Sequence, residues 1–108
     1  MTVKELSLID GFYPLVISDG TRSVDGVYIG DLLSWVMGKA QSGDAWLTIM
    51  SNINILAVAS LSDVACIILT EGVVLDEEVI KTAQDKEINI ISTKLSSYEA
   101  SVILSDVL

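Results

Sequence analysis

Histidine is absent from this sequence, and cysteine occurs once, as Cys66. Without histidine the chain lacks the commonest general base and metal ligand, and a Ser-His-Asp or Cys-His catalytic group is excluded. A lone cysteine forms no internal disulfide, and Cys66 lies in the apolar run 64–69, which predicts a buried side chain. A reactive thiol is the alternative. We therefore expect no enzymatic activity.

Basic residues are also scarce. Six lysines and arginines stand against 15 aspartates and glutamates, which gives a formal net charge of −9. Such a charge repels phosphate backbones and anionic membrane surfaces, and no local cluster of basic residues offsets it. We expect neither nucleic acid nor a membrane as a partner.

Long apolar segments are missing as well. No run approaches the roughly 18 residues of a membrane-spanning helix. The first residues, Met1–Glu5, lack the basic and apolar regions of a secretory signal. With 108 residues, the chain is long enough for one domain, spanning residues 1–108. We expect a cytoplasmic, single-domain protein.

Strand-like and helical patterns alternate through the second half of the chain. In chain order these patterns cover residues 45–50, 53–61, 65–70, 76–87, 88–93 and a final helix that opens at 96. Continuous apolar strands separated by helices indicate a parallel sheet with both faces covered. The sequence predicts an α/β fold, with three layers (α/β/α), a mainly parallel sheet of about four to five strands, and consecutive βα units in the second half.

The first half is less regular. Thr2 can cap a short helix that ends at Gly11, and residues 12–18 form a strand-like run. The stretch 19–30 is rich in turn residues. Asp31 can then cap a further helix. The apolar stripe of this helix would contain Leu32, Leu33, Val36 and Met37.

Several segments resemble the DRTGG domain family, in order and in spacing, from about Gly20 to the C-terminus. They are residues 26–37 (GVYIGDLLSWVM), 43–49, 54–59, 76–80 and 90–93. The family's Thr-Gly-Gly is here Asp25-Gly26-Val27, and Asn52 stands near a position where members often carry histidine. The resemblance implies a fold like the N-terminal domain of HPr kinase/phosphorylase. It also implies a regulatory role, with adenine-nucleotide sensing where CBS domains accompany the family.

A first group of candidate ligand-binding residues ends the predicted strands. Ligands of parallel α/β proteins bind at the carboxyl ends of the strands, and helix N-termini there can hold an anion. The small polar residues at these places are Ser51, Asn52, Thr70, Ser92, Thr93 and Ser96. Ser96 also begins a capping box with Glu99. Ordinary caps and turns are the alternative interpretation of these hydroxyls.

A second candidate group precedes the predicted helix at Asp31. Gly26 and Gly30 flank Tyr28, and Arg22 is the only cation of this loop. The spacing differs from the GxGxxG and Walker motifs, so turn geometry explains the glycines at least as well as phosphate binding. For Arg22, the alternative is a local ion pair with Asp19 or Asp25.

Asp25 and Asp31 form a pair of carboxylates of the kind that binds Mg²⁺. A helix cap is the competing role for Asp31. We predict no metal site, and the residues identify no cofactor.

Apolar residues make up 51% of the chain, above the usual 45–50% or so. A second copy would cover the surplus, and a monomer of this size cannot readily bury Tyr28, Ile29 and Trp35 together. DRTGG domains in larger proteins also tend to pair. We therefore expect a homodimer through Tyr28–Met37, with about 1,200–2,000 Å² buried in total.

The sequence thus predicts a stand-alone regulatory or sensing module. It would bind a small ligand, for which the resemblance suggests an adenine nucleotide, or a protein partner. One alternative is a scaffold subunit without a small ligand. The other is a Mg²⁺-dependent enzyme or phosphoacceptor that uses Asp25 or Asp31.

Overall fold

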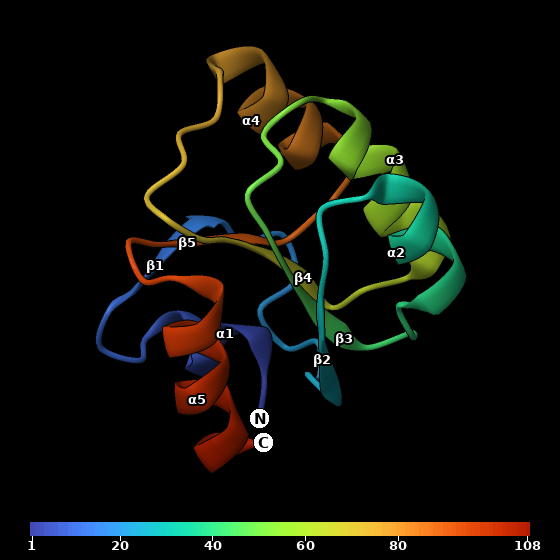
Figure 1. Cartoon of the computed structure of the whole chain (residues 1–108). Coiled ribbons are helices and arrows are strands. Elements are labelled where there is room, and N and C mark those ends of the chain that lie inside the picture. The colour runs from blue at the N-terminus through green and yellow to red at the C-terminus, as the bar shows by residue number, and fades with distance from the viewer.

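One five-stranded sheet forms the centre of the computed structural model, which describes all 108 residues (Figure 1). The elements are α1 (Val3–Ser7), β1 (Phe12–Val16), β2 (Gly26–Ile29), α2 (Leu33–Lys39), β3 (Asp44–Thr48), α3 (Asn54–Ser62), β4 (Cys66–Leu69), α4 (Glu77–Asp85), β5 (Ile90–Thr93) and α5 (Ser97–Val107). The strand order is β1-β5-β4-β3-β2. Strands β2 to β5 are parallel, and β1 joins β5 in antiparallel orientation.

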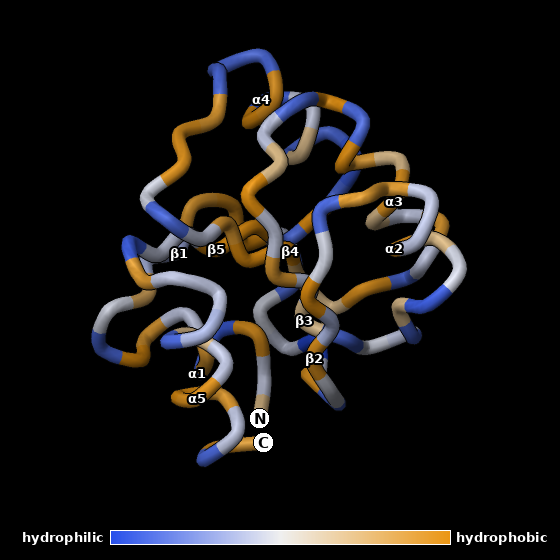
Figure 2. The backbone as a smooth tube through the Cα atoms, viewed as in Figure 1, coloured by the Kyte–Doolittle hydropathy of each residue, from blue (hydrophilic) through white to orange (hydrophobic).

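Helices cover both faces of the sheet. On one face, Trp46, Ile67 and Ile90 pack in a core with side chains of α2, α3 and α4. On the other face, Leu47 and Ile68 pack with side chains of α1 and α5. Figure 1 shows these two groups of helices on opposite sides of the sheet, and much of the tube through β4 and β5 is orange in Figure 2. The predicted three-layer α/β/α fold is confirmed.

Strand β2 was not predicted. Residues 26–29 belong to the stretch expected to form turns, but they pair in parallel with β3 along residues 44–47. The strand is only four residues long and lies within a stretch rich in turn residues, which hides the strand preference of Val27, Tyr28 and Ile29. It forms one edge of the sheet.

The other edge, β1, contains an irregularity. Its register against β5 shifts between Pro14 and Val16. Phe12 consequently packs in the core under α1 and α5, whereas Val16 packs on the opposite face. An edge position also tolerates the missing N–H of Pro14.

Two of the three predicted caps are present. Thr2 and Ser96 each form a capping box, at the starts of α1 and α5. Asp31 was expected to cap α2, but the helix begins after Leu32 without a side-chain cap. The Asp31 carboxylate instead accepts hydrogen bonds from the Thr48 hydroxyl at 2.8 Å and from the Ile49 N–H at 3.0 Å. It therefore ties the end of β2 to the end of β3.

The predicted apolar stripe of α2 is only partly directed inward. Val36 is fully buried and Leu33 packs against the core. Leu32 and Met37 are exposed, at 62% and 50%. None of the five helices has the length and apolar character needed to cross a membrane.

Candidate functional site

The carboxyl ends of β2 to β5 meet at one edge of the sheet, because these strands are parallel. This carboxyl edge carries five of the nine predicted site residues: Ser51, Asn52, Thr70, Thr93 and Ser96. Ser92 lies within β5, directly before Thr93, and Tyr28 lies within β2; Arg22 and Gly26 are further away. The structure thus places the larger part of the predicted set where ligands of parallel α/β proteins bind.

Two hydroxyls of the carboxyl edge are fully buried and bonded within the chain. Thr93 Oγ1 donates to the carbonyl of Gly11 at 2.7 Å and accepts from the N–H of Leu95 at 3.2 Å. Thr70 Oγ1 lies 3.2 Å from Ser97 Oγ. The first pair of bonds connects the end of β5 to the turn before β1 and to the loop before α5, and the last connects the end of β4 to α5. Ligand binding by Thr70 and Thr93 remains a prediction.

Three helices begin at this edge, and they differ in how well they could receive an anion. Ser96 Oγ accepts from Glu99 N–H at 3.1 Å, and the Glu99 carboxylate accepts from Ser96 N–H. Helix α4 has two glutamates in its first turn. Carboxylates at these positions oppose a further negative charge. Helix α3 has no acidic residue in its first turn, and Ser51 and Asn52 precede it in an exposed loop. The Asn52 side-chain oxygen accepts from the N–H of Asn54, the first residue of the helix, at 2.9 Å.

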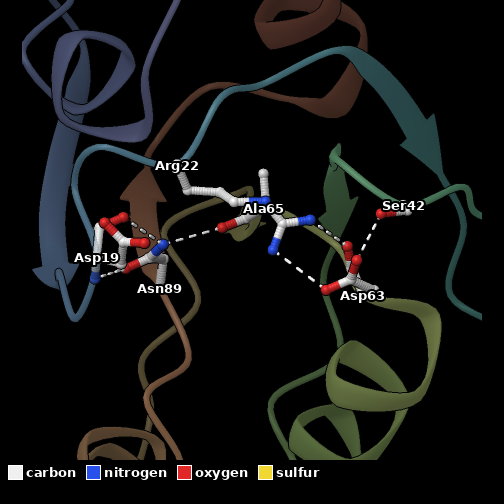
Figure 3. A network of polar contacts seen from close by, with 6 residues as sticks. All are labelled: Asp19, Arg22, Ser42, Asp63, Ala65 and Asn89. Carbon is white, nitrogen blue, oxygen red and sulfur yellow. Dashed lines mark hydrogen bonds and ion pairs between the residues drawn. The ribbon is translucent and has the colours of Figure 1, made fainter.

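Arg22 and Gly26 lie at the opposite, amino end of the strands. The Arg22 guanidinium donates to the Asp63 carboxylate at 3.2 Å and to its backbone carbonyl at 2.8 Å (Figure 3). The expected ion pair with Asp19 or Asp25 is wrong, since the partner lies 41 residues further along the chain. The Ser42 hydroxyl donates to the same carboxylate. The pKa of Asp63 is lowered, first by the hydrogen bond from Ser42 and then by the hydrogen bond and the positive charge of Arg22.

Asn89 forms the second half of the network in Figure 3. Its side-chain oxygen accepts from the backbone N–H groups of Ser18 and Asp19, at 2.8 and 2.9 Å. Its amide nitrogen donates to the carbonyls of Asp19 and Ala65. Asn89 is 6% exposed. The network holds the loop after β1 against the sheet, and no local sequence pattern predicts it because its partners are about 70 residues apart.

Gly26 and Gly30 have structural roles at the two ends of β2. A Cβ atom on Gly26 would lie 2.7 Å from the Asp44 carboxylate, and one on Gly30 would lie 2.9 Å from the Tyr28 ring. Neither glycine has a positive φ, so close approach of a side chain, rather than turn geometry, accounts for them. Tyr28 itself is half-buried against the core beside α2 and α3.

Asp25 and Asp31 do not form a pair. They stand before and after β2, which separates them by about 20 Å at roughly 3.3 Å per extended residue. The Ser23 hydroxyl donates to Asp25, and Asp31 binds Thr48 and Ile49. No cluster of three or more potential metal ligands is present. The two carboxylates cannot bind one Mg²⁺ ion together.

Cys66 is buried in β4, as predicted. Burial raises the pKa of its thiol to about 12. Burial and a raised pKa both oppose the thiolate, which is the reactive form, so the structure favours a structural role for Cys66.

Several large apolar side chains are exposed along the segment expected to pair with a second copy. Ile29, Leu32, Trp35 and Met37 are all exposed, Trp35 at 59%. The Lys39 ammonium lies 5.8 Å from the centre of the Trp35 ring. We call these four residues the α2 patch.

The family model and a solved structure that match this chain agree with each other. The family model described as the DRTGG domain matches residues 16–107. A solved structure with the same fold contains the CBS and DRTGG domains of the regulatory region of Clostridium perfringens pyrophosphatase, complexed with its activator diadenosine tetraphosphate. Its TM-score is 0.69 at 19% sequence identity.

The aligned region covers 94% of this chain and 47% of the pyrophosphatase chain, so the present chain spans about half of that structure. A comparison with curated protein sequences gives no match.

Proposed function

This chain belongs to the DRTGG domain family, and we propose that it is a regulatory module that acts by binding and catalyses no reaction of its own. The observation that carries the proposal is the family match over residues 16–107. The fold supports it, since the similar structure from Clostridium perfringens is part of a regulatory region.

The ligand we propose for the carboxyl edge is a small molecule, with adenine nucleotides as the first candidates. The similar pyrophosphatase region is complexed with a dinucleotide, which supports this choice. The start of α3 supports this place for the ligand, because Ser51 and Asn52 are exposed there and no acidic residue in its first turn opposes an anion. Because the chain carries a net charge of −9, a polyphosphate would bind more tightly with Mg²⁺ than without it.

The second part of the proposal is a homodimer through Tyr28–Met37. The α2 patch supports it, because four large apolar side chains lie exposed on or beside one edge of the sheet. A two-fold interface brings the same patch of both copies together. The exposed patch also favours a second candidate function, a scaffold subunit that binds protein and no small ligand.

A screen of the purified protein for phosphatase, kinase and nucleotide-hydrolase activity tests the absence of turnover. We expect no activity above that of a blank purification. Asp25→Asn and Asp31→Asn serve as matched variants. Robust turnover that disappears in either variant would overturn the proposal in favour of an enzyme.

A further inference from the structure

A groove of about 340 Å³ lies between β1 and the loop that follows β4. Its walls are the side chains of Tyr13, Leu15, Val73, Val74, Leu75 and Ile80. The loop is fixed to the end of β5, because Glu71 N–H donates to the Leu95 carbonyl and Gly72 N–H donates to the Thr93 carbonyl, both at 2.9 Å. The groove is within the size range of small-molecule sites.

The fold leaves the walls of this groove uncovered. Val74 is 83% exposed, and Tyr13 and Leu15 are also exposed. The irregularity of β1 at Leu15 contributes, since it interrupts the alternation that would direct every second side chain into the core. An apolar ligand body would remove these side chains from water.

Few polar side chains line the groove, and none of them is acidic. Lys94 is the only charged residue of the groove, and Ser92 is the only hydroxyl besides that of Tyr13. The chain's one salt bridge joins Arg22 and Asp63, so no carboxylate lies within 4.0 Å of the Lys94 ammonium. Its side chain passes over Gly72, where an added Cβ would lie 3.8 Å from Lys94 Cγ. A single unpaired cation beside an apolar wall is complementary to a ligand with one anionic end.

We propose that the groove binds a small amphipathic carboxylate. The carboxylate would accept hydrogen bonds from Lys94 and Ser92, and an aliphatic body would lie against Tyr13, Leu15 and Ile80. This inference goes beyond the proposed function, because the groove shares only Ser92 with the predicted site and takes a different class of ligand.

The test is titration of the isotope-labelled protein with octanoate, followed through its backbone amide resonances. We expect saturable changes at residues 72–75 and 92–94. Octylamine and acetate, which lack the charge or the apolar body, should bind at least about tenfold more weakly. Lys94→Glu should weaken octanoate binding by at least about tenfold, and Leu15→Ser by about fivefold. Lys86→Glu makes the same charge change at the end of α4 and should leave binding unchanged.

Several results would overturn the inference. The first is that octylamine binds as tightly as octanoate, or that Lys94→Glu leaves the affinity for octanoate unchanged. The second is the absence of saturable binding with a folded spectrum. The third is a native dimer that Lys94→Glu converts to a monomer, which would assign the groove to a second copy of the chain. Nucleotide binding without octanoate binding would overturn this inference and leave the proposed function standing.

Discussion

The Asn89 side chain replaces backbone pairing where β1 ends and the following loop turns away from the sheet. Its four hydrogen bonds satisfy groups of Ser18, Asp19 and Ala65. Because Asn89 is buried, its removal would leave these backbone groups without a partner in a site that water enters poorly. Arg22 and Asp63 make a comparable connection at the surface, between the same loop and the end of α3.

Asn89→Ala should lower the free energy of unfolding by about 3 kcal/mol, since several buried polar groups lose their partner. Urea denaturation of both proteins measures this difference. Asn54→Ala is the control, because Asn54 is exposed at the start of α3 and its loss should change stability by less than about 0.5 kcal/mol. A loss for Asn89→Ala no larger than that of the control would contradict the role given to Asn89.

Asp63→Asn should reduce stability at neutral pH and flatten its dependence on pH in acid. The folded chain lowers the pKa of Asp63 below the model-compound value of 3.8. The stabilisation is therefore present above that value and is lost as the pH falls through the lower pKa of the folded state. Asparagine also tolerates the positive φ of 56° at this position, so the comparison measures the charge.

Melting temperatures between pH 2 and 7 check this prediction. Asp85→Asn, at the exposed end of α4, is the control. If the melting temperatures of the native protein and Asp63→Asn fall in parallel as the pH is lowered, the ion pair makes no measurable contribution to stability.

At the scale of the element, the second half of the chain follows from its sequence. Runs such as Cys66–Leu69 are apolar at every position and bounded by turn residues, so both the strand and its burial on two faces are predictable. The amphipathic pattern of α4 and the capping box of α5 are equally local signals.

The first half depends on contacts between distant segments. Strand β2 exists because β3 provides a partner for residues 26–29. Asp31 binds the end of β3 instead of capping α2, because the Thr48 hydroxyl and the Ile49 N–H are within reach only in the folded sheet. For the candidate site, the sequence predicted which residues end the strands, and the alternative of ordinary caps and turns fits the bonds that Thr93 and Ser96 accept from nearby N–H groups. The bonds from Thr93 to Gly11 and between Thr70 and Ser97 join distant segments, so no local pattern predicts them.

Ser96→Ala should lower the free energy of unfolding by about 1 kcal/mol, because the first turn of α5 loses its capping box. Chemical denaturation checks the value. Ser105→Ala serves as the control, since Ser105 is exposed near the end of the same helix and donates only to the carbonyl of Val102. Equal effects of the two substitutions would contradict the importance of the cap.

At the scale of the whole molecule, the arrangement of charge and apolar surface determines how the chain can associate. A net charge of −9 on each copy opposes pairing, but physiological salt screens charges over about 8 Å. The α2 patch acts in direct contact, where burial of apolar area dominates.

Light scattering at micromolar concentration should give a mass about twice the 11.6 kDa of one chain. Trp35→Glu should give a folded monomer, because the exposed Trp35 side chain contributes to the interface and not to the core. Tyr98→Glu, at an exposed position of α5, should remain a dimer. A monomeric native chain would refute the dimer, and a folded, dimeric Trp35→Glu would refute the position of the interface.

The central claim is that this chain regulates by binding a small ligand, and a thermal-shift panel of adenine nucleotides and common metabolites, with and without Mg²⁺, tests it most directly. A ligand with a Kd near 10 μM, present at 1 mM, should stabilise the fold by about 2.7 kcal/mol, because it binds only the native state. We predict at least one stabilising ligand. A protein that melts at the same temperature with every member of the panel would contradict the claim and favour the scaffold function.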